Sequence, residues 1–305
     1  MSQASILIVG AGAMGLASGY HLQLAGARIT FLVRRGRIDA FHAPQTLYCY
    51  DDAQLKQFDG YRTVDDVASI ATEVFDYVIV TLDGATARST EGQAVLRALG
   101  ETIRASTAQV LMGGVGIGLR EHYLQTMRLA EERLSSGFLG LLAHQTRATL
   151  PARAPTDPAQ LAQASVAYRH FSNKIGFFID TSNATVAKRF AALYNQCDVS
   201  RCGLMNKTLV SIITNSAFPM LAASDIAGWP DITTLTANKE LWRLACRAQG
   251  EIAALPQHGW MGKLMALVMT PSLSAKLQLK LEREMLPLDY QAFNRFHHGG
   301  KVRMQ

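Results

Sequence analysis

The sequence predicts an α/β domain followed by an all-α domain. Over residues 1 to about 115, short apolar runs rich in β-branched residues alternate with helical patterns, which is typical of a parallel sheet with crossover helices. After about residue 183 the strand pattern stops and long helical patterns follow. We therefore place the boundary so that the domains are residues 1–182 and 183–305.

The individual elements follow from apolar periodicity and from turn residues. In the first part, strands are expected at residues 5–10, 28–33, 76–82 and 108–113, with a weaker run at 46–50, and helices at 15–27 and 86–103. Residues 136–149 and 166–181 look like strands of a hairpin or mixed extension, separated by a loop whose three prolines exclude a central strand. Helices are then expected at residues 184–197, 201–224, 234–259 and 272–285.

Composition and charge exclude several classes of function. The 305 residues are 49% hydrophobic and 18% charged, an ordinary globular composition. No apolar run reaches the roughly 18 residues of a membrane span, and no basic leader precedes the first strand, so we expect no membrane partner and a cytoplasmic location. The net charge of +6 is spread without basic blocks, which argues against nucleic acid and suits an anionic cofactor or substrate.

Cysteine spacing and apolar helices bear on metals and oligomers. The four cysteines show no spacing typical of a metal site, so no metal is expected. The apolar helices at residues 203–224 and 262–281 offer surface for a homodimer, although packing in a core explains them equally well.

A glycine loop follows the first expected strand. Gly10, Gly12 and Gly15 form the pattern G-x-G-x-x-G between an apolar strand and a helix. In that context the first glycine permits a tight turn, the second lets the backbone approach a pyrophosphate, and the third allows close helix packing. The sequence therefore predicts a Rossmann-type domain that binds a dinucleotide, rather than a structural turn rich in glycine. The loop residues expected to contact the cofactor are Gly10, Ala11, Gly12, Ala13, Met14 and Gly15.

The end of the second strand indicates which dinucleotide is bound. An acidic residue there would accept a hydrogen bond from the ribose of NAD, whereas an arginine can pair with the 2′-phosphate of NADP. Arg34 and Arg35 follow that strand, and no carboxylate appears before Asp39. NADP(H) is therefore the favoured cofactor, and solvated loop arginines are the alternative interpretation.

Two further strand ends should border the same crevice, because ligands of such sheets bind outside the carboxyl ends of the strands. Thr81 and Leu82 end one strand, and Val115 lies in the glycine-rich segment after the next. We expect these three residues to line the cofactor. Asp83 either lies near the substrate or caps the helix that follows.

A single lysine interrupts an apolar helical pattern at residues 203–215. Lys207, Ser211 and Asn215 follow one another at intervals of four and would share one helix face. A buried lysine loses hydration, which lowers its pKa and suits a proton donor near neutral pH; alternatively, Lys207 extends to solvent. Beside a reduced nicotinamide, Lys207 could protonate a substrate carbonyl oxygen while Ser211 and Asn215 hold polar groups of the substrate.

Taken in order along the chain, these features resemble the ketopantoate reductase (2-dehydropantoate 2-reductase) family. The resemblance includes the glycine loop, the arginine pair, the strand at 76–82, the glycine-rich segment at 113–118, the His-bearing stretch at 140–146 and the Lys207 helix. More loosely, the spacing of Gly203, Lys207 and Ser211 is similar to a helix of β-hydroxyacid dehydrogenases.

The resemblance implies roles for residues of the helical domain. Lys207 would be the proton donor, and Ser211 and Asn215 would contact the substrate. Asp225 would lie near another substrate-contacting position, and Ser274 or Ser272 would be the substrate-binding serine.

Three positions depart from the pattern of this family. Asp83 stands where the family usually has a lysine, Val115 where it has an asparagine, and Pro287 where it has a glutamate. The reversed charge at Asp83 disfavours a carboxylate substrate such as ketopantoate. We therefore expect an NADPH-dependent reductase of a different small carbonyl or imine substrate. An authentic ketopantoate reductase, and an NADP(H)-binding sensor or partner protein without catalysis, are the alternatives.

Overall fold

The computed structural model describes residues 3–147, 150–171 and 173–299, and the chain divides into two compact units. Unit 1 consists of Met1–Arg147 and Ala159–Asn206, and unit 2 of Ala148–Pro158 and Lys207–Gln305. The division therefore falls after residue 206, whereas the sequence analysis placed it after residue 182. The reason is that residues 201–205 form a strand that pairs with the sheet of unit 1.

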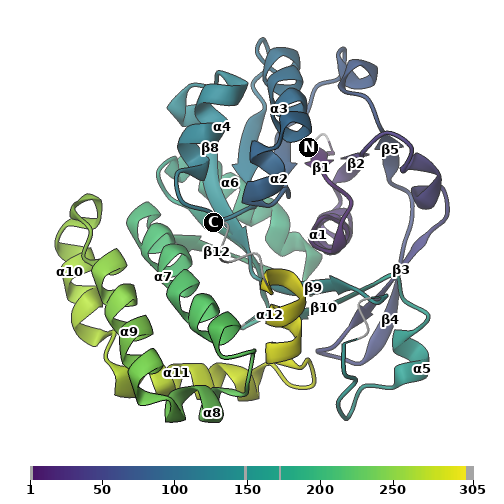
Figure 1. Ribbon diagram of the computed structural model, residues 1–305. Helices are drawn as coiled ribbons and strands as arrows, with labels where there is room; N and C mark the ends of the chain where they lie inside the picture. Colours follow the sequence, from purple (N-terminus) through teal and green to yellow (C-terminus); the bar gives the residue numbers. More distant parts are fainter. Residues whose placement is uncertain (1–2, 148–149, 172, 300–305) are drawn as a thin grey trace. The chain divides into compact units, whose positions relative to one another are not determined.

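Unit 1 is built on an eight-stranded sheet in the order β12-β11-β8-β7-β6-β1-β2-β5 (Figure 1). Neighbouring strands are parallel except β8 and β11, which are antiparallel. The strands are β1 (Ser5–Val9), β2 (Arg28–Leu32), β5 (Arg62–Val64), β6 (Tyr77–Val80), β7 (Gln109–Met112), β8 (Leu134–Leu139), β11 (Ile175–Asp180) and β12 (Arg201–Met205). The chain runs outward from β1 to β2 and β5 and then returns to β6 on the other side. The predicted α/β class is confirmed, and β1 marks the point where ligands of such sheets bind.

A smaller, four-stranded sheet also belongs to unit 1. Its order is β4-β3-β10-β9, from β3 (Gln45–Cys49), β4 (Gln54–Phe58), β9 (Leu141–Gln145) and β10 (Val166–His170). The weak strand expected at 46–50 is thus present, but it pairs with β4 and β10 instead of extending the main sheet.

Helices cover both faces of the main sheet. Ile6 and Ile8 face the core that contains α1 and α6, whereas Leu7 and Val9 face the core that contains α3 and α4. A parallel strand buried on both faces is expected to be apolar throughout, as β1 is. The helices of unit 1 are α1 (Ala13–Leu24), α2 (Gly84–Arg88), α3 (Thr90–Thr102), α4 (Leu119–Met127) and α6 (Ala184–Tyr194), and the short α5 (Pro158–Leu161) begins at the last residue of a unit 2 segment.

Unit 2 is helical over Lys207–His298 in the described part of the chain (green to yellow in Figure 1). Its helices are α7 (Lys207–Ile226), α8 (Ile232–Ala237), α9 (Lys239–Ala253), α10 (Gly259–Val268), α11 (Pro271–Glu284) and α12 (Tyr290–His298). Their core is formed by apolar residues of α7, α8 and α9, among them Met220, Leu235 and Trp242. The segment Ala148–Pro158 joins this unit through a bridge between Ala152 and Leu288 and an ion pair between Arg153 Nη2 and Asp289 Oδ2 (2.5 Å).

Two expectations for the helices are wrong. The helix expected at 201–224 begins only at Lys207, because residues 201–205 form β12. The helix expected at 234–259 is divided, because the Asn238 side chain caps α9 by accepting from Leu241 N at 3.2 Å.

Helix α7 bears on the expectation that no segment is long and apolar enough to span a membrane. By length and composition alone, it is the one helix in the described part of the chain that could cross a membrane. Apolar core helices of soluble proteins pass the same test, and α7 contributes Met220 and Ala223 to the core of unit 2.

Candidate functional site

The glycine loop lies between β1 and α1, and its backbone requires glycine at two positions. Gly10 has a φ of +101°, a conformation that residues with a Cβ rarely adopt. A Cβ on Gly15 would lie 2.0 Å from the Gly10 carbonyl oxygen, so α1 can approach the loop only without a side chain there. A Cβ on Gly12 would meet no protein atom within 4 Å, so that part of the loop is open to a ligand.

The beginning of α1 suits an anion. Gly12 is its N-cap and supplies no side-chain hydrogen bond, and the first turn contains no acidic residue. The first N–H groups of a helix have no helical partner and carry a partial positive charge. Ala11 is buried, while Ala13 and Met14 pack in part against the core, so these residues offer backbone N–H groups rather than side chains. The loop therefore fits the pyrophosphate of a dinucleotide.

Thr81 holds the loop from the neighbouring strand end. Its hydroxyl donates to the carbonyl oxygens of Val9 (2.9 Å) and Gly10 (3.2 Å). A Cβ on Gly10 would lie 2.8 Å from the same hydroxyl. Thr81 thus lies beside the loop, and its side chain supports the backbone.

The two arginines after β2 differ in their partners. Arg35 pairs with Asp66, with 2.5 Å between Nη2 and Oδ2. Arg34 is exposed, and none of the ion pairs found among the described residues involves it. Of the pair, Arg34 is therefore the cation available to a phosphate.

The segments that follow β6 and β7 lie close together because Gly113 and Gly114, just after β7, have no side chains. A Cβ on Gly114 would lie 2.5 Å from the Leu82 carbonyl oxygen, and one on Gly113 would lie 3.1 Å from that of Val80. Leu82 is half-buried, and Val115 is 39% exposed. Leu82 thus lies just beyond the carboxyl end of β6, the strand beside β1, and Val115 lies just beyond the carboxyl end of β7, the next strand.

Arg88 fixes this glycine-rich segment, a role that sequence reasoning missed. Its guanidinium donates to the carbonyl oxygen of Ile117 and, at 3.5 Å, to that of Gly84. A basic residue at the end of a short helix beside a glycine-rich loop was the only available signal. Arg88 therefore ties α2 to the loop that carries Val115.

Asp83 caps α2. Its Oδ1 accepts a hydrogen bond from the Thr86 backbone N–H at 2.7 Å, and the residue is exposed. Of the two roles considered for Asp83, the capping role is present. Its second carboxylate oxygen still places negative charge at the carboxyl end of β6.

In unit 2, Lys207 is the first residue of α7 and is exposed. Of the two expectations for this side chain, the structure matches the one in which it extends to solvent. Gly203 belongs to β12 and not to the same helix, so the looser similarity to the β-hydroxyacid dehydrogenase helix is wrong in its first position.

Ser211 and Asn215 contact each other on the first half of α7, as their spacing predicts. Asn215 Nδ2 lies 3.2 Å from Ser211 Oγ. Ser211 Oγ also lies 3.0 Å from Nε2 of His258, a histidine that is 4% exposed and that sequence reasoning missed. A polar residue between Pro256 and Gly259, just after a helix end, was the only signal in the sequence.

Asp225 and Ser274 lie elsewhere in unit 2. Asp225 accepts a hydrogen bond from the Trp229 indole at 3.0 Å, and it follows Lys207 by about 27 Å along a helix that rises about 1.5 Å per residue. Ser274 is buried and hydrogen-bonds with the Cys246 thiol in the helical core. Asp225 therefore lies near the other end of α7 from Lys207, and the Ser274 hydroxyl is engaged inside the helical core.

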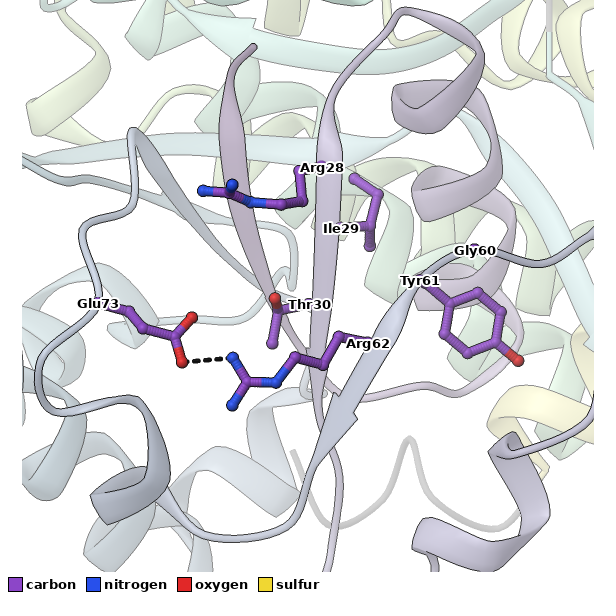
Figure 2. A pocket seen from close by; sticks show the side chains of 7 residues that line it. All are labelled: Arg28, Ile29, Thr30, Gly60, Tyr61, Arg62 and Glu73. Carbon is purple, nitrogen blue, oxygen red and sulfur yellow. Dashed lines mark hydrogen bonds and ion pairs between the residues drawn. The ribbon is translucent and has the colours of Figure 1, made fainter. Parts of the chain in front are cut away.

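A pocket of about 600 Å³ in unit 1 lies away from the glycine loop (Figure 2). Arg28 and Arg62, the first residues of β2 and β5, line it, and Arg62 is paired with Glu73. The pocket is therefore at the amino ends of these strands. The cofactor crevice of such a sheet is at the carboxyl ends, so this pocket is not the dinucleotide site.

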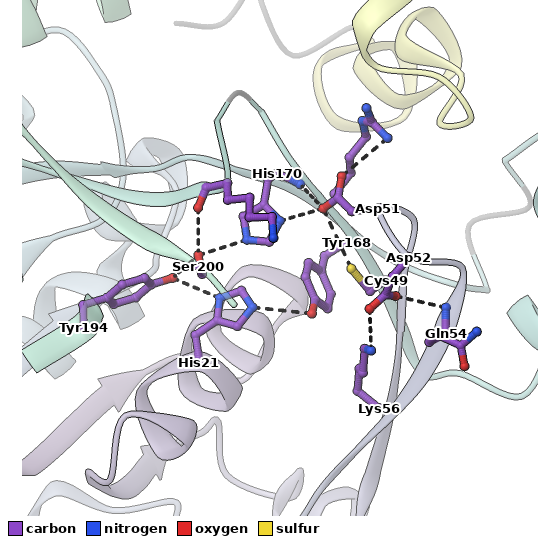
Figure 3. A network of polar contacts seen from close by, with 12 residues as sticks. His21, Cys49, Asp51, Asp52, Gln54, Lys56, Tyr168, His170, Tyr194 and Ser200 are labelled. Atoms are coloured by element: carbon purple, nitrogen blue, oxygen red, sulfur yellow. Dashed lines mark hydrogen bonds and ion pairs between the residues drawn. The ribbon is translucent and has the colours of Figure 1, made fainter. Parts of the chain in front are cut away.

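A buried polar network contacts α1 through His21, in the last turn of that helix (Figure 3). His21 Nδ1 lies 3.0 Å from the Tyr194 hydroxyl, which lies 3.2 Å from Ser200 Oγ. Ser200 Oγ is 2.9 Å from Nε2 of His170, whose Nδ1 lies 2.6 Å from Asp51 Oδ2. Asp, His and Ser thus occur in the order of a hydrolase triad, but Ser200 is 1% exposed and cannot meet a substrate.

Burial controls the charge state within this network. Burial, with a smaller effect of the nearby His170, lowers the pKa of His21 to about 3, so its imidazole is neutral at pH 7. The two imidazole rings are stacked with centroids 5.4 Å apart. Burial alone would raise the pKa of Asp51, but hydrogen bonds from His170 hold that pKa below its usual value.

Comparison with known proteins tests the family prediction. Residues 6–112 match the family model described as ketopantoate reductase PanE/ApbA. The predicted resemblance to the ketopantoate reductase family is confirmed. No curated protein matches the sequence.

Several solved structures share the ketopantoate reductase-like fold. A PanE/ApbA family ketopantoate reductase from Ralstonia eutropha JMP134 is 16% identical, with a TM-score of 0.61 over 98% of this chain and 97% of its own. A 2-dehydropantoate 2-reductase from Geobacter metallireducens GS-15 is 16% identical, with a TM-score of 0.57 over 98% and 97%. D-mandelate dehydrogenase, solved with NADH, is 14% identical, with a TM-score of 0.61 over 95% and 84%. Members of this ketopantoate reductase-like group are oxidoreductases, and a nicotinamide dinucleotide fits the glycine loop of this chain.

Proposed function

We propose that this chain is an NADPH-dependent reductase of a small carbonyl or imine compound. The observation that carries the proposal is the glycine loop, where Gly10 and Gly15 are required by the backbone and the outer side of Gly12 is open. The exposed Arg34 at the end of β2 supports NADPH over NADH, because its guanidinium can pair with a 2′-phosphate.

When bound, the reduced cofactor supplies a hydride. In the proposed reaction, the Lys207 ammonium group gives a proton to the substrate oxygen or nitrogen, which balances the hydride added at carbon. Asn215 holds a polar group of the substrate. Asp83 keeps negative charge at the end of β6, which supports a substrate other than the carboxylate ketopantoate.

A kinetic assay tests this proposal. Purified protein should consume NADPH with a member of a panel of keto acids, keto esters and cyclic imines. Lys207→Ala should lower kcat by about 10²- to 10⁴-fold, the usual contribution of a positioned proton donor, and leave NADPH affinity unchanged. Lys239→Ala is the matched control, because Lys239 is likewise an exposed lysine at the first position of a helix in unit 2. Unchanged turnover in Lys207→Ala would contradict the assignment.

The exposure of Lys207 favours a second candidate, an NADP(H)-binding sensor or partner protein without turnover. Tight NADPH binding with no NADPH consumption across the panel would establish it. An authentic ketopantoate reductase is the remaining alternative, and a rate above background with ketopantoate would establish that one.

We also propose a cytoplasmic homodimer. Trp260, Leu264 and Leu267 form an exposed apolar stripe on α10, with 74%, 54% and 75% exposure. Such a stripe is typical of an interaction surface. A monomeric mass in size-exclusion chromatography with light scattering would contradict the dimer.

A further inference from the structure

The three polar side chains His258, Ser211 and Asn215 form a chain of hydrogen bonds inside unit 2. His258 Nδ1 lies 3.1 Å from the carbonyl oxygens of both Ile252 and Ala253. Its Nε2 lies 3.0 Å from Ser211 Oγ, which in turn lies 3.2 Å from Asn215 Nδ2. The three side chains therefore form a continuous series of hydrogen bonds from the end of α9 to the face of α7.

The direction of each hydrogen bond follows from the first one. A carbonyl oxygen can only accept, so His258 Nδ1 must carry a proton and donate it. In a neutral imidazole Nε2 is then an acceptor, and the Ser211 hydroxyl must donate its single proton to it. Ser211 Oγ can consequently only accept from Asn215, which requires the amide nitrogen of Asn215 to face it. The amide oxygen, Oδ1, is therefore turned away from Ser211.

His258 is held firmly enough to impose this direction. Ala253 is the last residue of α9, where carbonyl oxygens lack a helical donor, and His258 Nδ1 donates to its carbonyl oxygen and to that of Ile252, which also accepts from the Leu255 N–H at 3.4 Å. A Cβ on Gly262 would lie 2.1 Å from the Ala253 carbonyl oxygen and 2.5 Å from His258 Cβ. The glycine thus lets α10 close over the histidine.

Pro219 leaves a second acceptor at the same residue. A proline has no N–H, so the Asn215 carbonyl oxygen four residues earlier lacks its helical donor. Within the described residues, no hydrogen bond to Asn215 Oδ1 is found either. Asn215 therefore has two oxygens that can accept hydrogen bonds.

We propose that His258 is a positioning residue that acts through Ser211 to present Asn215 Oδ1 as an acceptor for a hydroxyl or N–H group of the substrate. The inference rests on the proposed reductase function. It also changes the role of Ser211, whose proton is committed to His258 and is not available to the substrate.

The hydrogen-bond direction is tested without turnover. In ¹⁵N-labelled full-length protein, His258 should show a protonated Nδ1 and an unprotonated Nε2. His258→Leu should shift the side-chain amide signals of Asn215, whereas His258→Gln, which keeps an acceptor near the Nε2 position, should restore them. Gln257→Ala is the matched control, because Gln257 is the exposed neighbour in the same turn. A protonated Nε2 on His258 would overturn the proposal, because Nε2 would then donate to Ser211 Oγ instead of accepting from it.

The substrate consequence is tested with two uncharged probes, 4-hydroxybutan-2-one and butan-2-one, which differ by one hydroxyl group. The wild type should prefer the hydroxylated probe by up to about tenfold in kcat/KM, the effect of one hydrogen bond. His258→Leu should remove this preference mainly through KM, and His258→Gln should restore it. In a Ser211→Ala background, His258→Leu should have no further effect.

The outcomes separate this inference from the proposed function. An unchanged preference in His258→Leu overturns the positioning role even if Lys207→Ala abolishes turnover. If the wild type reduces neither probe but reduces a carbonyl compound that bears no hydroxyl or N–H group, the donor-bearing substrate class is overturned. If it reduces nothing, the reductase proposal and the substrate role of Asn215 both fail, and the tautomer of His258 alone decides the hydrogen-bond direction.

Discussion

Acid should destabilise unit 1 through His21, the buried histidine of α1. Its imidazole bridges the hydroxyls of Tyr194 (3.0 Å) and Tyr168 (3.4 Å) and is fully buried. Burial lowers its pKa in the folded state to about 3, whereas the unfolded chain has the ordinary value of 6.5. As pH falls from 6.5 toward 3, the unfolded state therefore binds a proton that the folded state does not, and the free energy of unfolding decreases.

The size of the effect follows from those two values. Integrating the difference in bound protons from pH 7 to pH 5 gives a loss of about 2 kcal/mol from this one histidine. The loss should be absent above pH 7, where both states are neutral, and it should level off below about pH 3, where both are charged.

Urea unfolding followed by far-ultraviolet circular dichroism at pH 7 and pH 5 measures this loss. His21→Gln keeps a neutral polar group but cannot be protonated, so its free energy of unfolding should fall by about 2 kcal/mol less than that of the wild type. His42→Gln is the control, because the His42 side chain is 68% exposed. If His21→Gln and the wild type lose the same stability between the two pH values, the assignment of the acid sensitivity to His21 is refuted.

Three further predictions concern the dinucleotide half of the site. Gly12→Ala should fold normally and weaken NADPH binding about tenfold or more. Gly15→Ala should also lower the melting temperature, because only a Cβ on Gly15 meets the loop backbone. Fluorescence titration and thermal unfolding distinguish the two variants, and equal behaviour would contradict the loop geometry. Arg34→Glu should shift the preference from NADPH toward NADH by about tenfold. Arg35→Ala removes an arginine that is already paired with Asp66 and should shift the preference less. The measurement is the ratio of the two dissociation constants, and equal shifts would contradict the assignment of Arg34. Asp83→Ala should lower the free energy of unfolding by about 1 kcal/mol, because α2 loses its cap. Asp83→Lys should raise activity with ketopantoate if the negative charge of Asp83 is what excludes that substrate. No gain in that assay would count against this explanation.

The parts of the fold that were predictable from sequence are those fixed by local patterns. The glycine loop was predictable, because the backbone conformation at Gly10 and the close approach at Gly15 admit no other residue type. Strands β1, β6 and β7 were also predictable, because a strand that is buried on both faces requires a continuous apolar run. The cap by Asp83 follows from its position before a helix.

The parts that were missed depend on partners distant in the chain. Residues 201–205 are apolar enough to extend the helical pattern of α7, and only their pairing with β11 makes them a strand. The face of α7 that holds Ser211 and Asn215 was visible from spacing, but the contact with His258 lies 47 residues away and leaves no periodic trace. The exposure of Lys207 was one of two alternatives because it depends on where the helix begins.

The segment Ala148–Pro158 has a consequence for anyone who would separate the two units. It belongs to unit 2 but enters the chain in the middle of unit 1, so a fragment that starts at Lys207 leaves it behind. In such a fragment Asp289, whose side chain is 13% exposed, loses the Arg153 guanidinium beside the start of α12. Domain exchange with a relative by a single crossover at residue 206 should therefore give poorly folded chimaeras, and a second crossover that includes the segment should rescue them.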